Sequence, residues 1–508
     1  MITGNAVYLG SLTFAAVARF FIPGIIFRIL NRRKPLMVYY LTSSRRAETW
    51  AGIIRFLLRI PCAELDYAST DLRDPTGDSL YIKIVEADTL KVINRIIQNE
   101  LESHPLVRKI SRKFEKDRLL AYFYKQLAPD LIPLLVQINV AGWHHRTFFD
   151  QPAGQPIIYL ASSDWSTYLK AYAKEHGLGI EFFRRPGIHG WVPWKRVRHA
   201  VIRFGKAFLL ARRRRTVKTA STQGEHQDHR DLNVIAAEFS GNGVSLDPSQ
   251  NSHLFWLPFC EVPPGQVLVY CTRPDDPLND EKVRILDEAR FRYVAMSRAA
   301  AASERAPVWL PSSSFLKRAA GMVSWVLWQS LQTAFYHPKR LSWLMPRMLF
   351  LGVDYAYWRT FFETYRVKVI FNSQGSPQRR ISAEQALADL GGISASYQRS
   401  HLTTPNPWVG YSVDVHFAFS PMVSDLLLLS GACASQVVAT GYVCDRGFTG
   451  AAPRAERLRA TLKERGARFI ACFLDEGSVP NKKTVIGPTA MPLTITTSCL
   501  PSCWKTLI

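Results

Sequence analysis

Short runs of apolar and β-branched residues alternate along the chain with helical or turn-rich stretches. The alternation is clearest in the last third, where five such runs follow one another: Lys368–Asn372, Ile393–Gln398, Val415–Phe419, Gln436–Thr440 and Arg468–Leu474. Each run is followed closely by Ser, Gly, His or Asp. Continuous apolar runs of this length are typical of strands that are buried on both faces of a parallel sheet. The pattern therefore predicts an α/β fold with a mostly parallel sheet.

The same alternation is present further upstream. We expect strands at Pro156–Ala161, Gly179–Phe183, Val234–Phe239, Val267–Cys271, Phe291–Ala295 and Val308–Leu310. The run YIKIV at 81–85 also has a strand pattern, and residues from 87 to 127 have the polar and apolar spacing of a long helical stretch. Strands that alternate with helical stretches are the signature of β-α-β units.

The N-terminus is unusually apolar. Residues 1–18 carry no charged side chain, and the apolar character continues past Arg19 to Leu30, just before Arg32, Arg33 and Lys34. A spanning helix would hold Arg19 near its middle, which is costly. We therefore expect a tilted or interfacial membrane anchor with the basic cluster on the cytoplasmic side. The alternative is an ordinary amphipathic helix that packs on the core.

A second membrane candidate is the segment 321–362, in which four tryptophans are interspersed with lysine and arginine. Tryptophan is frequent at bilayer interfaces because its ring is apolar and its N–H is polar. Pro338 and Pro346 divide the segment into shorter helices. A membrane surface and a helical hairpin that covers the sheet both fit this pattern.

The chain is strongly basic, with 64 Lys and Arg against 41 Asp and Glu and a net charge of +23. Much of the excess lies between residues 184 and 218, where tryptophan and phenylalanine are mixed with the cations. This mixture suits a membrane interface better than a nucleic-acid tail, and a solvated basic face is the alternative. The residues expected to contact membrane or phosphate are Arg212, Arg213, Arg214 and Arg215.

The eight cysteines form no CxxC pair, so reduced cysteines are expected rather than disulfides or a zinc site. The common phosphate-loop, dinucleotide, hydrolase and zinc-protease motifs are also missing. Candidate chemistry lies instead at the ends of the predicted strands, and carboxyl ends of parallel strands share one edge. The residues expected to meet in one cleft are Gln398, Arg399, Ser400, His401, Thr440, Gly441, Asp475 and Glu476. Among them, Arg399 suits a phosphate and His401 suits a hydroxyl that must lose its proton.

Three segments in a fixed order carry a family resemblance. SYQRSH at 396–401, DVHFAF at 414–419 and VVATGYVCD at 437–445 resemble GT-B-type glycosyltransferase-like proteins of bacterial surface-polysaccharide synthesis. IAAEFSGNGVSLD and PPGQVLVY, between residues 235 and 270, are similar to the middle of the same proteins. The resemblance covers about residues 230–477.

This resemblance implies two Rossmann-like domains that face a cleft, a nucleotide-sugar donor as substrate, and neither a metal nor another cofactor. His401 would then be the catalytic base, and Arg399 would stabilise the departing phosphate. The remaining strand-end residues, Gln398, Ser400, Thr440, Gly441, Asp475 and Glu476, would bind the donor.

Four regions are expected. They are an apolar membrane-associated segment at 1–34, a mixed α+β region at 35–150, a Rossmann-like domain with basic and aromatic insertions at 151–450, and an incomplete second Rossmann-like domain at 451–508. The last 28 residues from Asn481 have no regular pattern, which suggests a truncation or a shifted reading frame near Asn481, with a genuine short tail as the alternative.

Together these features predict a membrane-associated glycosyltransferase-like protein on the cytoplasmic face of the inner membrane. Its partners would be the nucleotide-sugar donor, a glycan or lipid-linked acceptor, and the membrane surface, with no nucleic acid. Two alternatives stay open. One is a non-catalytic scaffold of the glycan machinery, inactive through the truncation, and the other is a basic nucleic-acid-binding protein.

Overall fold

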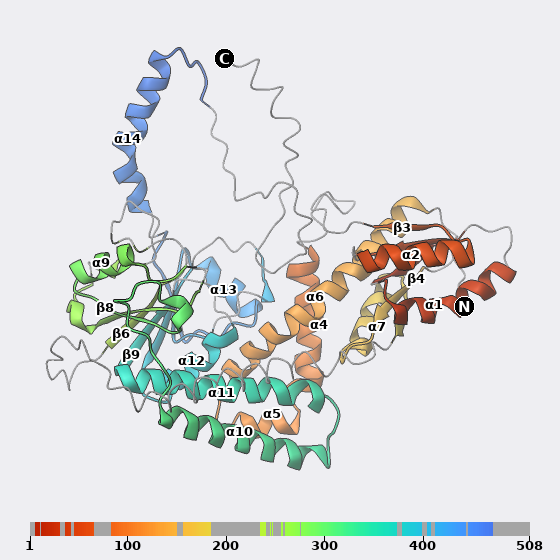
Figure 1. Ribbon diagram of the computed structural model, residues 1–508, viewed down its shortest axis with the longest axis horizontal. Coiled ribbons are helices and arrows are strands. Elements are labelled where there is room, and N and C mark those ends of the chain that lie inside the picture. Colours follow the sequence, from red (N-terminus) through yellow and green to blue (C-terminus); the bar gives the residue numbers. More distant parts are fainter. Residues whose placement is uncertain are drawn as a thin grey trace. The chain divides into compact units, whose positions relative to one another are not determined.

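The computed structural model shows two parallel sheets with helices around them (Figure 1). It describes residues 6–10, 12–30, 36–41, 45–65, 83–149, 156–183, 234–239, 244, 246, 254, 256–257, 260–274, 276–372, 378–398, 404–407, 412–442 and 445–470. The described residues fall into two compact units. We call the one up to Gln98 and from Gln126 to Phe183 the five-stranded unit. The seven-stranded unit comprises Asn99–Lys125 and the described residues from Val234 to Ala467.

The five-stranded unit has the strand order β3-β2-β1-β4-β5, and all neighbouring strands are parallel. Its strands are β1 (Ala6–Leu9), β2 (Met37–Tyr40), β3 (Cys62–Glu64), β4 (Ile157–Ala161) and β5 (Gly179–Phe183). Helices α1 (Phe14–Leu30), α2 (Arg45–Leu58) and α7 (Ser166–Glu175) connect or follow them. The α/β prediction with parallel sheets is thus confirmed.

Strand β1 forms the centre of this sheet because its side chains are apolar on both faces and fully buried. Val7 and Leu9 pack with Phe20 of α1 and Ile54 of α2 in one core cluster. The expectation that residues 1–34 form a membrane-associated segment is therefore corrected for Ala6–Leu9, which form a buried strand. An uncharged run that is apolar on all sides fits a buried central strand as well as it fits a membrane.

The seven-stranded unit has the order β12-β11-β10-β9-β6-β7-β8, again with parallel neighbours. Its strands are β6 (Val234–Phe239), β7 (Val267–Cys271), β8 (Arg292–Ala295), β9 (Val367–Asn372), β10 (Ile393–Tyr397), β11 (Val415–Ala418) and β12 (Gln436–Ala439). Numbered within each unit, the order of the first five strands is 3-2-1-4-5 in both sheets. This is the doubly wound order of Rossmann-like folds.

Helices cover both faces of the seven-stranded sheet. On one face, Val283 and Leu286 of α9 (Asp280–Glu288) pack against Val267 and Val269. On the other face, the ring of Tyr270 lies 5.8 Å from Trp358 of α11 (Leu341–Tyr365). The remaining helices are α10 (Ser313–Ala334), α12 (Gln378–Ala388), α13 (Met422–Leu429) and α14 (Asp445–Glu464).

Helices α10 and α11 pack against each other (Figure 1). Trp343 and Trp358 of α11 are buried, so this part of the segment 321–362 is a helical pair that covers the sheet. Pro346 lies in the second turn of α11, where it lacks the N–H that would bond to the Ser342 carbonyl, yet the helix continues through it. The expected break of the helix at Pro346 is therefore wrong, whereas Pro338 lies between α10 and α11 as expected. The exposed side of α10 is described below.

Residues 83–148 are helical apart from the turns at 102–104 and 111–115. They form η1 (Ile84–Asp88), α4 (Thr89–Ile96), η2 (Ile97–Leu101), α5 (Pro105–Ile110) and α6 (Lys116–Phe148), of which η1 and η2 are π-helical turns. The predicted strand at 81–85 is wrong for its last three residues, because Ile84 begins a buried helical face that continues through Leu90 and Ile93. The expected long helix breaks where the His104 side chain caps α5 ahead of Pro105.

The division of the chain also differs from the expected one. Strands β4 and β5, assigned to a 151–450 domain, pair with β1 in the five-stranded sheet, because β1 and β4 are neighbours there. Both parallel sheets are formed before residue 440. Arg468–Ile470, the start of the strand expected to open a second domain, are exposed and outside any strand. The rest of that strand and residues 471–508 lie outside the described residues.

Candidate functional site

The point where a doubly wound sheet changes direction is the usual ligand site of such folds, at the carboxyl ends of the strands. In the seven-stranded sheet this point lies between β6 and β9, which are neighbours although β7 and β8 come between them in the chain. Glu238 is the second-last residue of β6, and Asn372 is the last residue of β9. Thr272 follows β7 directly. These polar residues therefore share the carboxyl edge of the sheet.

Glu238 is held from two sides. The Thr272 hydroxyl donates to its Oε1 at 2.7 Å, and the guanidinium of Arg380 pairs with its Oε2. Arg380 lies in the first turn of α12, and both members of the ion pair are buried. An ion pair is tolerated in such a place only when its hydrogen bonds are well satisfied. The pair fixes the beginning of α12 against the end of β6.

Asn372 differs from its neighbours because half of its amide is unused. Its Oδ1 accepts a hydrogen bond from the Tyr270 hydroxyl at 3.2 Å. Burial raises the pKa of Tyr270, which keeps this hydroxyl protonated as a donor. The Asn372 side chain is 1 % exposed, and its Nδ2 has no hydrogen-bond partner among the described residues. A buried donor without a partner costs about 1–3 kcal/mol, so such a group suggests a position that a ligand completes.

A chain of buried charges continues from Arg380 away from this edge. Glu384, one turn further along α12, is 0 % exposed and accepts a hydrogen bond from the Ser412 hydroxyl. Arg118 of α6 donates to the Ser412 carbonyl at 3.1 Å and to Asp414 at 2.6 Å. Lys125, also on α6, is buried within the same group.

Burial sets the protonation of this group. It lowers the pKa of Lys125, and the nearby Glu384 carboxylate only partly offsets the effect. Burial likewise raises the pKa of Glu384, against the Ser412 hydrogen bond and the neighbouring cations. We call Arg118, Lys125, Glu238, Arg380 and Glu384, together with the half-buried Asp414, the buried charge network. It connects the carboxyl edge through α12 and α6 to the beginning of β11.

The structure describes three of the residues that the sequence predicted for the site. Gln398 follows β10 and is buried, and its Oε1 accepts from the Phe419 backbone N–H at 2.7 Å. Thr440 follows β12 and is exposed, with its backbone N–H bonded to the Ala418 carbonyl at 2.8 Å. Gly441 has a φ of +74° and open space around its Cα, so the backbone is accessible there. Gln398 and Thr440 thus end strands on either side of β11.

The other predicted site residues cannot be placed. Arg399, Ser400, His401, Asp475, Glu476 and the four arginines Arg212, Arg213, Arg214 and Arg215 lie outside the described residues. Whether they join the described strand ends in one cleft stays a prediction.

The sequence analysis missed Glu238, Thr272, Asn372 and Arg380. A signal was present for two of them, since a carboxylate stands inside the apolar run VIAAEF and an amide ends the run VKVIFN. A polar residue at the end of a fully buried strand is rarely there for packing. Arg380 had no such signal, because its partner Glu238 is 142 positions away in the chain.

The corresponding edge of the five-stranded sheet lies between β1 and β4 and has a different chemistry. Gly10 follows β1, and a Cβ there would meet the Gln137 side chain and come within 2.5 Å of Leu160 Cδ2. Tyr8 bonds His144 Nδ1 of α6 at 2.9 Å. Burial lowers the pKa of His144 to about 4, so this imidazole is neutral at pH 7.

Comparison with known proteins gave no match: neither a family model, nor a curated protein, nor a solved structure is similar enough to indicate a relationship. Within the described ranges, no three His, Cys, Asp or Glu side chains gather as metal ligands would. None of the helices in the described part of the chain combines the length and the hydropathy of a membrane span. The function is therefore inferred from the residues and the fold.

Proposed function

We propose that this protein is a glycosyltransferase-like enzyme that binds a nucleotide-activated sugar at the carboxyl edge of the seven-stranded sheet. The observation that carries the proposal is the buried Nδ2 of Asn372, at the point where the sheet changes direction, which has no partner among the residues that the structure describes. Two doubly wound sheets in one chain also suit the GT-B-type architecture that the sequence resembles.

The described residues suggest a role for each group at the edge. Asn372 Nδ2 would donate to an oxygen of the donor, and the N-terminus of α12, which follows β9, would favour its phosphates. The Glu238–Arg380 ion pair is a positioning element, because it holds the first turn of α12 without being free to bind ligand. Thr440 and Gly441 follow β12, so they would border the same edge three strands beyond β9.

The proposed reaction is a displacement at the anomeric carbon of the donor. The acceptor hydroxyl oxygen would form the new bond while the bond to the phosphate oxygen breaks, and the nucleotide would leave with the electron pair. His401 would take the hydroxyl proton, and Arg399 would balance the charge of the leaving phosphate. Association with the cytoplasmic face of a membrane, where lipid-linked acceptors are found, is part of the proposal.

Nucleotide binding tests the proposal. Isothermal titration with a panel of nucleoside diphosphates and nucleotide sugars should give at least one ligand that binds the native chain. Asn372→Ala should weaken that ligand at least tenfold, because a buried hydrogen bond to a charged phosphate is worth about 1.5–3 kcal/mol. Tyr270→Phe is the matched control, since it removes the same Tyr270–Asn372 bond and leaves Nδ2 in place.

The proposal holds if Tyr270→Phe binds within about twofold of the native chain while Asn372→Ala does not. It fails if no member of the panel binds, which would favour a non-catalytic scaffold. It also fails if the two variants weaken binding equally, because the Asn372 amide would then matter only through Tyr270.

A further inference from the structure

Helix α10 has two apolar faces, and only one of them is covered. Phe315, Met322 and Val326 are buried on the side toward the rest of the seven-stranded unit. The opposite side carries a row of large apolar residues that solvent reaches: Leu327, Trp328, Leu331, Phe335 and Tyr336. Trp328 is 58 % exposed and Phe335 is 83 % exposed. Their spacing of three or four residues places Trp328, Leu331 and Phe335 along one line of the helix.

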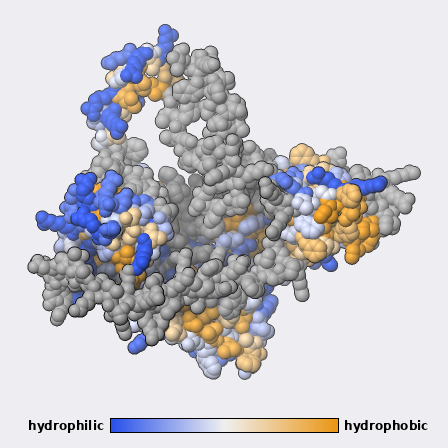
Figure 2. Space-filling view, viewed as in Figure 1, coloured by the Kyte–Doolittle hydropathy of each residue, from blue (hydrophilic) through white to orange (hydrophobic). Residues whose placement is uncertain are grey.

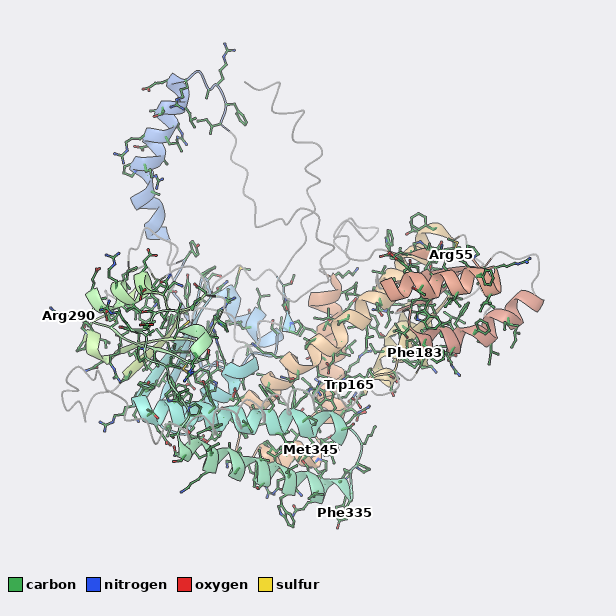
Figure 3. The ribbon with its side chains drawn as sticks, viewed as in Figure 1. Arg55, Trp165, Phe183, Arg290, Phe335 and Met345 are labelled. Atoms are coloured by element: carbon green, nitrogen blue, oxygen red, sulfur yellow. The ribbon has the colours of Figure 1, made fainter. Side chains whose placement is uncertain are left out.

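The pictures show the same surface. Hydrophobic side chains gather along the lower edge of the space-filling view, where Figure 1 places α10 (Figure 2). Figure 3 labels Phe335 at the end of α10, on the outer side of the helix pair. An isolated exposed leucine needs no explanation, but a contiguous row of aromatic and aliphatic side chains indicates an interaction site.

A basic pocket lies beside this row. It has a volume of about 360 Å³ and is lined by Lys109, Arg112, Lys113, Trp325 and Gln329. Lys109 donates to Gln332 Oε1 at 2.9 Å, and the Lys113 ammonium lies 5.3 Å from the centre of the Trp325 ring. None of the residues that line the pocket is acidic. The three cations come from α5 and the turn after it, and they form no ion pair among the described residues.

We propose that this α5–α10 surface docks on a membrane that contains anionic phospholipid, with a lipid phosphate in the basic pocket. The charge of the pocket matches a phosphate, and the neighbouring row has the composition of an interfacial helix face. Tryptophan, tyrosine and phenylalanine are favoured at the level of the headgroups, and leucine reaches into the acyl region. An uncharged apolar protein surface would leave the three cations at the border of the row without an opposite charge, whereas lipid phosphates supply it.

This inference deepens the membrane association within the proposed function, and it does not depend on the donor site. The surface belongs to α5 and α10, whereas the donor site lies at the carboxyl ends of the strands. Nucleotide binding without vesicles and vesicle binding without nucleotide therefore test the two proposals separately.

The test is co-sedimentation of the full chain with vesicles of phosphatidylcholine alone or with 30 % phosphatidylserine, a composition of roughly physiological surface charge. The native chain should bind the anionic vesicles at least tenfold more tightly. The variant Lys109→Gln/Arg112→Gln/Lys113→Gln should lose most of that preference, since each basic residue near the surface contributes roughly fivefold. The matched control is Arg454→Gln/Arg457→Gln/Arg459→Gln on α14, which removes the same charge from exposed positions.

A second pair of variants tests the apolar row. Trp328→Ser/Phe335→Ser should weaken binding to both kinds of vesicle, whereas Leu458→Ser on the exposed side of α14 should not. Circular dichroism checks that each variant is folded. The proposal is overturned if the native chain does not distinguish the two vesicles, or if the α5 variant binds like the α14 control. The apolar row would then be assigned to a protein partner.

Discussion

The two sheets share a strand order but differ in what they bury. In the described five-stranded unit, the buried charged side chain is Asp88, which accepts a hydrogen bond from the Tyr172 hydroxyl. Its core near β1 otherwise contains aliphatic, aromatic and neutral imidazole groups. In the described seven-stranded unit, the buried charged residues are Arg118, Lys125, Glu238, Arg347, Arg380 and Glu384.

The difference shows which unit contains groups that are costly to bury. A buried charge is expensive, and a well-packed apolar group of similar size is often as stable or more so. Among its described residues, the five-stranded unit has the same strand order with one buried carboxylate, Asp88. The larger set of buried charges in the seven-stranded unit is therefore not required by the strand order. One of its ion pairs, Glu238–Arg380, lies at the edge where the unpartnered amide of Asn372 suggests a ligand site.

The largest predicted effect concerns the buried charge network. Lys125→Met should lower the free energy of unfolding of the seven-stranded unit by about 3–5 kcal/mol, because it removes one of the three cations, with Arg118 and Arg380, that offset the burial of the Glu384 carboxylate. Urea unfolding followed by tryptophan fluorescence measures this. The double variant Lys125→Met/Glu384→Leu should recover part of the loss in a double-mutant cycle. Additive effects would show that the two side chains do not interact.

The stability of the five-stranded unit should depend on close packing rather than on buried charges. Gly10→Ala should cost about 1–3 kcal/mol, because the new methyl group would overlap Gln137 and Leu160. Gly52→Ala in α2 is the matched control, since a Cβ there meets nothing within 4 Å. It should be neutral or stabilise by about 0.5–1 kcal/mol. Thermal unfolding of both variants would decide, and equal effects would contradict the close packing at the end of β1.

Acid should destabilise the two units to a similar extent, and by less than the substitutions above. Burial lowers the pKa of His144, in the five-stranded unit, and of His416, in the seven-stranded unit, to about 4. Each imidazole is neutral in the folded chain, whereas the unfolded chain takes up protons below about pH 6.5. Their contribution is therefore complete above pH 6.5 and is lost as the pH falls toward 4.

By pH 5 the loss should reach about 1–2 kcal/mol for each histidine. Unfolding midpoints between pH 7 and pH 4 give the slope, and His144→Phe and His416→Leu should each flatten it. A stability that does not change over this range would mean that the two imidazoles take up protons in the folded chain as readily as in the unfolded chain.

The strands of the seven-stranded sheet were predictable because each is a short apolar run bounded by turn residues, as at Val267–Cys271. Strand β1 was not recognised as one, although its run is equally apolar. A strand that is buried on both faces and a membrane segment are both surrounded by apolar groups, so both are continuous apolar runs in the sequence. Residues 83–85 were misjudged because three to five residues do not distinguish a period of 2 from one of 3.6.

The site was less predictable than the fold. Gln398 has the polar character of a ligand contact, but its side chain serves the backbone of Phe419 on the neighbouring strand. Conversely, Asn372 is a site candidate because Tyr270 bonds its Oδ1 while its buried Nδ2 has no partner among the described residues. Neither the Tyr270 contact nor the burial of the amide can be read from the sequence around Asn372. Ion pairs such as Glu238–Arg380 join distant parts of the chain, so they follow from the strand order and not from local spacing.

The most direct test of a ligand site at the edge of the seven-stranded sheet is hydrogen exchange with and without a saturating nucleotide sugar. A ligand bound at this edge should slow exchange in peptides that cover the ends of β6 and β9 and the first turn of α12. The end of β1 and the residues around Gly10 should not change. Protection confined to the five-stranded unit, or none at β6, β9 and α12 while the ligand is bound, would contradict a ligand site at this edge.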